Sequence, residues 1–190
     1  MAGHNTCTKI TNELIPKNGI IVFDWDNTLK MYDKTTRQIS SRVEKSDLQA
    51  WKKDKQCEMY IISAINPSKI NLETLLFEVT KLGLQDLFTE KEDKIEVHAG
   101  KFARKGNIII CGYDKAETFL QVSKVQLGKT SDEALHLSGV PADDIDAKSG
   151  VHDSFDGAMP ERNVVFFDDE EVNIVNFSSI VKDSKCFLVK

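Results

Sequence analysis

The sequence lacks a long apolar run, a paired-cysteine motif and a long basic stripe. No stretch approaches the roughly 18 apolar residues needed to cross a bilayer, and residues 1–18 lack the apolar segment of a signal peptide. The four cysteines are scattered, with no Cys-x-x-Cys pair and no histidine at metal-ligand spacing. These absences predict no membrane partner and a reducing, intracellular setting, which we expect to be the cytoplasm.

The charge balance is acidic, with 25 lysines and arginines against 30 aspartates and glutamates. This balance argues against nucleic acid as the main partner, because polyanions are bound through basic surfaces. A length of 190 residues with 41% hydrophobic residues suits one domain with a sizeable core. We expect a polar lead-in over residues 1–19 and a single domain over residues 20–190, in which residues 130–160 form an irregular insertion.

Short apolar runs alternate with helical patterns along the chain. The apolar runs predict strands at residues 20–23, 59–62, 108–111, 164–167 and 186–189. The helical patterns lie at about residues 46–56, 66–82, 114–128, 132–137 and 170–180. Strands that are apolar throughout are buried on both faces. The pattern therefore predicts an α/β fold, with a three-layer, Rossmann-like parallel sheet flanked by helices.

Four local signals predict where these helices begin and end. Ser46 begins a sequence typical of a capping box, and Asn66 with Pro67 resembles a cap followed by proline at the first helical position. Asp114 is a further candidate N-cap, and Gly83 is a plausible helix stop. The polar residues 29–45 predict a small flap.

Polar side chains follow the predicted strands where each strand ends. Asp24 and Asp26 follow the first strand, and Ser63 follows the second. Lys115 begins the helix after a further strand, and the pair at residues 168–169 follows the last buried one. Ligands bind at the carboxyl ends of the strands in such sheets, so we expect these groups to converge.

The converging carboxylates predict a bound cation. Two like charges about 4 Å apart repel by roughly 4 kcal/mol at an effective dielectric near 20, so several carboxylates in one crevice need a cation or protons. Hard oxygen ligands without a nearby histidine or cysteine suit Mg²⁺ better than zinc. Ser63 and Lys115 would supply a hydrogen bond and a positive charge for phosphoryl oxygens. A carboxylate can itself be a covalent nucleophile toward phosphorus.

Four segments together resemble the motifs of the haloacid dehalogenase (HAD)-like hydrolase superfamily, phosphatase type. The segment at residues 23–29 is similar to the Asp-x-Asp-x-Thr motif, and Ser63 ending an apolar strand is similar to the second motif. Lys115 resembles the third motif, and the acidic pair at residues 168–169 resembles the fourth. The order of the motifs also matches, over roughly residues 20–176. A response-regulator receiver gathers similar groups, but its acidic pair comes first.

The resemblance implies a Mg²⁺-dependent phosphatase that forms an aspartyl-phosphate on Asp24. Asp26 would act as general acid and base, and Lys115 would be the third catalytic residue. Phosphate-binding residues would be Ser63, Lys115 and Thr28, with Thr28 also supporting the loop. The metal ligands would be Asp24, Asp26 through its backbone carbonyl, Asp168 and Asp169.

The resemblance also bears on the substrate. Only a flap and a minimal cap fit between the motifs, which implies an open site and a phosphorylated substrate that is macromolecular or bulky. Three alternatives stay open: a phosphotransferase of the same superfamily, a non-catalytic HAD-like binding or regulatory protein, and a nucleic-acid end-processing enzyme. The acidic balance disfavours the last of these.

Overall fold

The computed structural model describes residues 4–123 and 162–190, which belong to one structural unit. Three predictions fall outside the described residues: the continuation of a helix to residue 128, the helix at 132–137 and the insertion at 130–160. Within the described ranges, no helix combines the length and the apolar character needed to cross a membrane.

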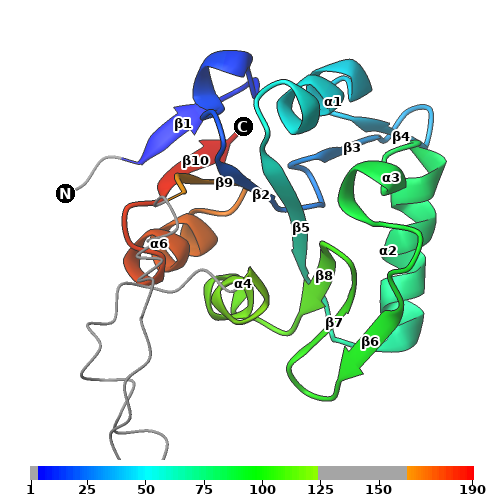
Figure 1. Ribbon diagram of the computed structural model, residues 1–190. Helices are drawn as coiled ribbons and strands as arrows, with labels where there is room; N and C mark the ends of the chain where they lie inside the picture. The colour runs from blue at the N-terminus through cyan, green and yellow to red at the C-terminus, as the bar shows by residue number, and fades with distance from the viewer. Residues whose placement is uncertain (1–3, 124–161) are drawn as a thin grey trace, which may run out of the picture. The chain divides into compact units, whose positions relative to one another are not determined.

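Eight strands form the main sheet, in the spatial order β1-β10-β9-β2-β5-β8-β7-β6 (Figure 1). Their bounds are β1 (Asn5–Cys7), β2 (Ile20–Phe23), β5 (Glu58–Ala64), β6 (Ile95–His98), β7 (Phe102–Lys105), β8 (Ile108–Cys111), β9 (Val164–Asp168) and β10 (Lys185–Val189). Along this spatial order, the five neighbouring pairs from β1 through β10, β9, β2 and β5 to β8 are parallel. The last two pairs, β8 with β7 and β7 with β6, are antiparallel. The predicted α/β class with a mostly parallel sheet is confirmed.

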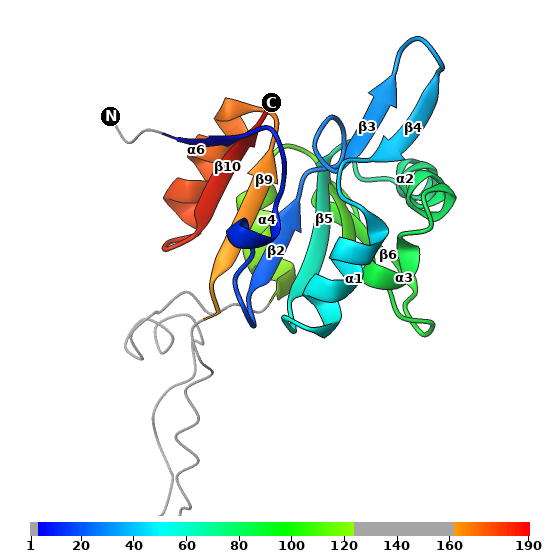
Figure 2. The same cartoon turned by 90° about the horizontal axis from the view of Figure 1, so that it is seen from above.

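Helices cover both faces of this sheet, which gives three layers (Figure 2). One face packs against α1 (Lys45–Lys53), α2 (Lys69–Lys81) and α3 (Gln85–Phe88), and the other against α4 (Lys115–Ser123) and α6 (Glu171–Ile180). Side chains along β2 alternate between the two resulting cores. Ile21 and Phe23 belong to the first core, and Ile20 and Val22 belong to the second. The continuous apolar pattern of β2 follows from this burial on both faces.

Two hairpins differ in how they relate to the main sheet. Strands β3 (Lys30–Asp33) and β4 (Gln38–Ser41) form a separate two-stranded sheet, at the position predicted for a flap (Figure 2). Strands β6 and β7 instead continue the main sheet, because β7 pairs with β8. The second hairpin is therefore an extension of the sheet edge.

The helix starts differ in two places from those predicted. The cap of α1 is Glu44, so Ser46 lies in the first helical turn and forms no capping box. The cap of α2 is Ser68, whose hydroxyl accepts a hydrogen bond from the backbone N–H of Asn71. Asn66 lies two residues before this cap, and its backbone carbonyl accepts a hydrogen bond from the Asn71 side chain.

Other boundaries agree with the sequence pattern. Gly83 directly follows the C-cap of α2 with φ of 68°, a left-handed conformation that favours glycine. The Asp114 side chain accepts from the backbone N–H of Glu117, as an N-cap does. The lead-in also contributes an unpredicted strand, because β1 pairs with β10, and a 3-10 turn at Asn12–Leu14 follows it.

Candidate active site

The carboxyl ends of β2, β5 and β9 enclose a small cavity of about 150 Å³. The polar groups predicted to converge do so here, together with four residues that the sequence pattern did not single out as phosphate or metal ligands. The lining comprises Asp24, Asp26, Asn27, Ser63, Ala64, Lys115, Asp168, Asp169, Glu170 and Asn173. Of the predicted site residues, Thr28 alone is not part of this lining.

Lys115 lines the cavity and joins two of its carboxylates. Its Nζ donates to Asp24 Oδ1 at 2.6 Å and to Asp168 Oδ2 at 2.6 Å. All three side chains are buried, with 5%, 7% and 1% exposure for Lys115, Asp24 and Asp168. Helix α4 delivers this lysine at its first residue, against the helix dipole. The two ion pairs explain why a lysine ammonium is found at this helix N-terminus.

The burial of these charges shifts their pKa values. Burial raises the pKa of the Asp24 carboxyl to about 7; the Lys115 ammonium offsets part of the rise and the Asp168 carboxylate adds to it. Burial alone would lower the pKa of Lys115, but Asp24 and Asp168 outweigh it and raise that pKa. Burial also raises the pKa of Asp169, with a further contribution from Asp168. One ammonium therefore does not balance the carboxylates of this cavity.

The Asp168 carboxylate is held by two further donors. The Asn173 side-chain amide lies 3.1 Å from both carboxylate oxygens, and the backbone N–H of Glu170 donates to Oδ1 at 2.9 Å. Asn173 lies in the first turn of α6, so the helix start fixes the orientation of the carboxylate. Such partners orient ligands in metal sites.

The loop after β2 is shaped by an arginine from the β3–β4 hairpin. Asn27 adopts φ of 60°, a left-handed conformation that asparagine tolerates better than most residues. Arg42, directly after β4, donates from Nη2 to the carbonyl of Asn27 at 2.8 Å and from Nε to the carbonyl of Thr28 at 2.6 Å. The hairpin thereby holds the loop that carries Asp26. No local pattern in the sequence pointed to Arg42.

Asp26 is held apart from the buried ion-pair cluster. Its carboxylate, half exposed, pairs with Lys30 Nζ at 2.6 Å. Lys30 also pairs with Glu78 Oε2 at 2.9 Å, and the same oxygen accepts from Trp25 Nε1 at 2.8 Å. Helix α2 is thereby connected to the first strand end through Glu78. Sequence reasoning missed Lys30 and Glu78, because a pairing over 48 residues leaves no local signal.

Ser63 and Thr28 have different surroundings. Ser63 is buried near the end of β5 and lines the cavity, and its hydroxyl forms no hydrogen bond to any described residue. It is free to bind a ligand. Thr28 is fully buried, and its hydroxyl donates to Asp169 Oδ1 at 3.5 Å. This contact agrees with a supporting role for Thr28 in the loop.

Three carboxylates form a candidate cation site. Oxygens of Asp24, Asp168 and Asp169 lie within 4.8 Å of one another, and the set contains only hard oxygen donors. Mg²⁺ prefers such donors, so these residues fit that ion. The Asp26 carboxylate is not in this group because Lys30 holds it. Metal binding through the backbone carbonyl of Asp26 stays a prediction.

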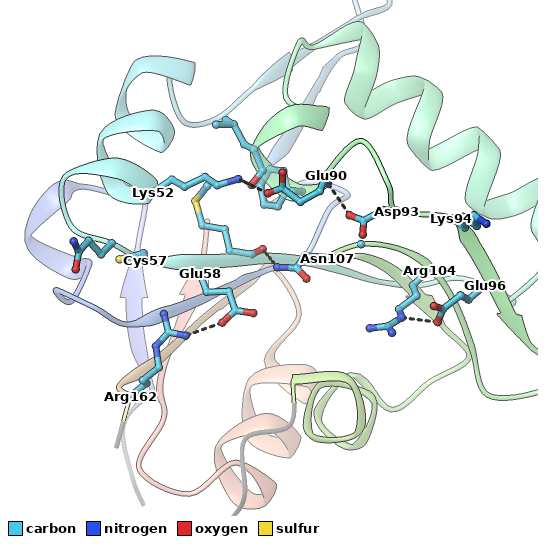
Figure 3. Close-up of a pocket in the computed structure, with 15 residues that line it drawn as sticks. Lys52, Cys57, Glu58, Glu90, Asp93, Lys94, Glu96, Arg104, Asn107 and Arg162 are labelled. Carbon is cyan, nitrogen blue, oxygen red and sulfur yellow. Dashed lines mark hydrogen bonds and ion pairs between the residues drawn. The ribbon is translucent and has the colours of Figure 1, made fainter. Parts of the chain in front are cut away.

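A larger cavity, of about 560 Å³, lies at the amino end of β5 (Figure 3). Most of its charged side chains pair with one another, including Arg162 with Glu58 at 2.7 Å and Arg104 with Glu96 at 2.9 Å. Asn107 donates to the carbonyl of Met59. These groups satisfy one another, whereas the smaller cavity carries uncompensated negative charge. We therefore assign the candidate active site to the smaller cavity.

No protein-family model, curated protein or solved structure matches this chain.

Proposed function

We propose that this chain is a Mg²⁺-dependent phosphomonoester hydrolase of the HAD-like superfamily that works through an aspartyl-phosphate on Asp24. The observation that carries the proposal is the Lys115 ammonium between Asp24 and Asp168, 2.6 Å from each, next to the Asp169 carboxylate. A buried nucleophile, a cation and a carboxylate cluster in one cavity are the groups that phosphoryl transfer needs. The order of the motifs supports the same assignment.

The first step would transfer the phosphoryl group to Asp24. Lys115 occupies Oδ1 of Asp24, which leaves Oδ2 as the attacking oxygen. The new Oδ2–P bond forms as the bond from phosphorus to the leaving oxygen breaks, and Asp26 donates a proton to that oxygen. Mg²⁺, held by Asp24, Asp168 and Asp169, would supply positive charge to the phosphoryl oxygens. Ser63 and Lys115 would bind those oxygens as well.

The second step would hydrolyse the aspartyl-phosphate. Asp26, now ionised, removes a proton from water, and the water oxygen attacks phosphorus. The Oδ2–P bond breaks, which releases inorganic phosphate and restores the Asp24 carboxylate. Asp26 is suited to both roles because it is half exposed at the cavity entrance and lies on a loop that Arg42 holds.

The surroundings of the cavity bear on the type of substrate. We propose that the β3–β4 hairpin is the flap of this site and that, within residues 4–123 and 162–190, the β6–β7 hairpin is the segment that corresponds to a minimal cap. The β6–β7 hairpin continues the main sheet, and the β3–β4 hairpin has two strands of four residues each, so neither forms a covering domain in the described part of the chain. The proposed substrate is therefore a phosphoester whose remaining part extends outward from the cavity, as a bulky or macromolecular ester does.

A panel of phosphomonoesters, assayed with and without Mg²⁺, tests this proposal. We expect Mg²⁺-dependent release of inorganic phosphate from at least one ester, and none beyond background with Asp24→Asn. An added alcohol acceptor separates hydrolysis from phosphotransfer, because a transferase would form a new ester instead of inorganic phosphate. Equal rates for the wild type and Asp24→Asn across the panel would favour the non-catalytic alternative.

A further inference from the structure

A second hollow adjoins the candidate active site on the side of α2. Its volume is about 150 Å³, and its lining comprises Trp25, Asp26, Lys30, Ile65, Asn71, Thr74, Leu75 and Glu78. Asp26 lines both hollows. In the proposed reaction Asp26 donates its proton to the leaving oxygen, so a leaving group can extend from the phosphoryl cavity past Asp26 into this second hollow.

The second hollow offers both donors and acceptors to a ligand. Lys30 Nζ carries three hydrogens and uses two of them, on Asp26 and Glu78. Glu78 uses Oε2 for Trp25 and Lys30, while its Oε1 has no hydrogen-bond partner among the described residues. The side-chain amide oxygen of Asn71, Oδ1, likewise accepts no hydrogen bond within the described part of the chain. Hydroxyl groups, which donate and accept, match this set best.

The size and charge of the hollow narrow the ligand further. At about 30 Å³ for each water in the liquid, its volume equals that of about five waters, enough for a short hydroxylated carbon chain. Trp25, Ile65 and Leu75 would contact the carbon atoms. Glu78 takes no part in the proposed proton transfer, and its carboxylate would repel a leaving group that carries a carboxylate of its own.

We propose that this hollow is the leaving-group subsite and that it selects the phosphate ester of a small neutral polyol, with Lys30 and Glu78 as the residues that determine specificity. The inference rests on the proposed phosphatase function and names its substrate class. In a larger ester, the polyol unit is the part next to the phosphate. Glu78 excludes an anionic leaving group, while Lys30 and Asn71 bind the hydroxyls.

A matched pair of substrates tests the subsite. Glycerol phosphate and 3-phosphoglycerate share a three-carbon skeleton and differ by a carboxylate, so the ratio of their kcat/KM values measures selection against charge. We expect the wild-type enzyme with Mg²⁺ to prefer glycerol phosphate by at least about tenfold. Glu78→Gln keeps an acceptor for Trp25 and removes the charge, and we expect it to reduce the preference at least about threefold.

Two controls separate the subsite from the proposed function. Glu73→Gln makes the same change on an exposed position of α2 that pairs only with Lys69 across the described residues, and it should leave the preference unchanged. An aryl phosphate, whose phenolate leaves readily, reports phosphatase activity on its own. Aryl phosphate hydrolysis with equal kcat/KM for the matched pair, or with the same preference in Glu78→Gln as in the wild type, would overturn the subsite alone. No hydrolysis of any ester would overturn both proposals.

Discussion

The two cavities at opposite ends of β5 differ in how their charges are balanced. The large one, of about 560 Å³, is lined by four cationic and four anionic side chains, and most of them pair with each other. The small one, of about 150 Å³, has five carboxyl groups and one lysine in its lining. Two of these carboxyl groups, Asp24 and Asp168, are buried and share the single Lys115 ammonium. Groups with perturbed pKa values cluster at functional sites, so charge balance rather than volume favours the small cavity as the candidate site.

The largest expected difference between the cavities is in activity. Asp24→Asn removes the proposed nucleophile in the small cavity, and we expect kcat/KM to fall by at least about a thousandfold. Asp93→Asn makes the same change in the large cavity, where Asp93 accepts from the backbone N–H of Glu90, and should leave kcat/KM within about twofold. Steady-state phosphate release measures both. A comparable loss of kcat/KM in the two variants would contradict the assignment of activity to the small cavity.

Stability should also separate the two cavities. Lys115→Met leaves the Asp24 and Asp168 carboxylates buried without their cation, and we expect a loss of about 3–5 kcal/mol in unfolding free energy. Arg104→Met removes one partly exposed ion pair, which is worth roughly 0–1 kcal/mol. Urea unfolding without metal measures both values. Similar losses for the two would contradict the account of Lys115.

An asparagine substitution in each cavity should affect Mg²⁺ affinity differently. Asn173→Ala removes one of the donors that orient the Asp168 carboxylate, and we expect Mg²⁺ to bind about 10–100-fold more weakly. Asn107→Ala removes a hydrogen bond to Met59 in the large cavity and should leave Mg²⁺ affinity unchanged. Calorimetric titration with Mg²⁺ gives both constants. Weaker Mg²⁺ binding in Asn107→Ala, together with unchanged binding in Asn173→Ala, would contradict the proposed location of the metal.

The smallest expected effect is on the pH dependence of stability. The pKa of Asp24 is raised in the folded protein, from an ordinary 3.8 to about 7, so the folded state holds this proton more tightly. Its contribution to stability is present below pH 3.8 and is lost as the pH rises through about 7.

Mg²⁺ binding must displace that proton at acidic pH. The thermal stabilisation by Mg²⁺ should therefore be larger at about pH 8 than at about pH 6, and Asp24→Asn should show less of this difference. Thermal unfolding at fixed Mg²⁺ concentration measures it. A thermal stabilisation by Mg²⁺ that is smaller at about pH 8 than at about pH 6 would contradict the predicted direction of this pH dependence.

Much of the fold and most of the small cavity follow from local sequence patterns. The apolar runs identify β2, β5, β8 and β9, and parallel topology brings their carboxyl ends together. Asp24, Ser63, Lys115 and the pair at residues 168–169 converge for that reason.

The remaining features depend on contacts between segments far apart in the chain. Trp25 and Glu78 pair across 53 residues, and Arg42 reaches back to the carbonyls of Asn27 and Thr28. Strand β1 has only three residues and is mostly exposed, so no apolar pattern identifies it. Such features require the folded arrangement, because each partner alone is an ordinary polar or surface residue.

The most direct test of the account is the identity of the residue that becomes phosphorylated. The protein is mixed with Mg²⁺ and a phosphoester from which it releases phosphate, quenched in acid within a turnover, and digested for fragmentation by mass spectrometry. The account predicts one phosphoryl group on Asp24, absent from Asp24→Asn. With an aryl phosphate, whose phenolate leaves without a proton from Asp26, it also predicts enrichment in Asp26→Asn, in which hydrolysis of the intermediate is slowed. A phosphoryl group on another residue, or turnover with no covalent intermediate, would contradict it.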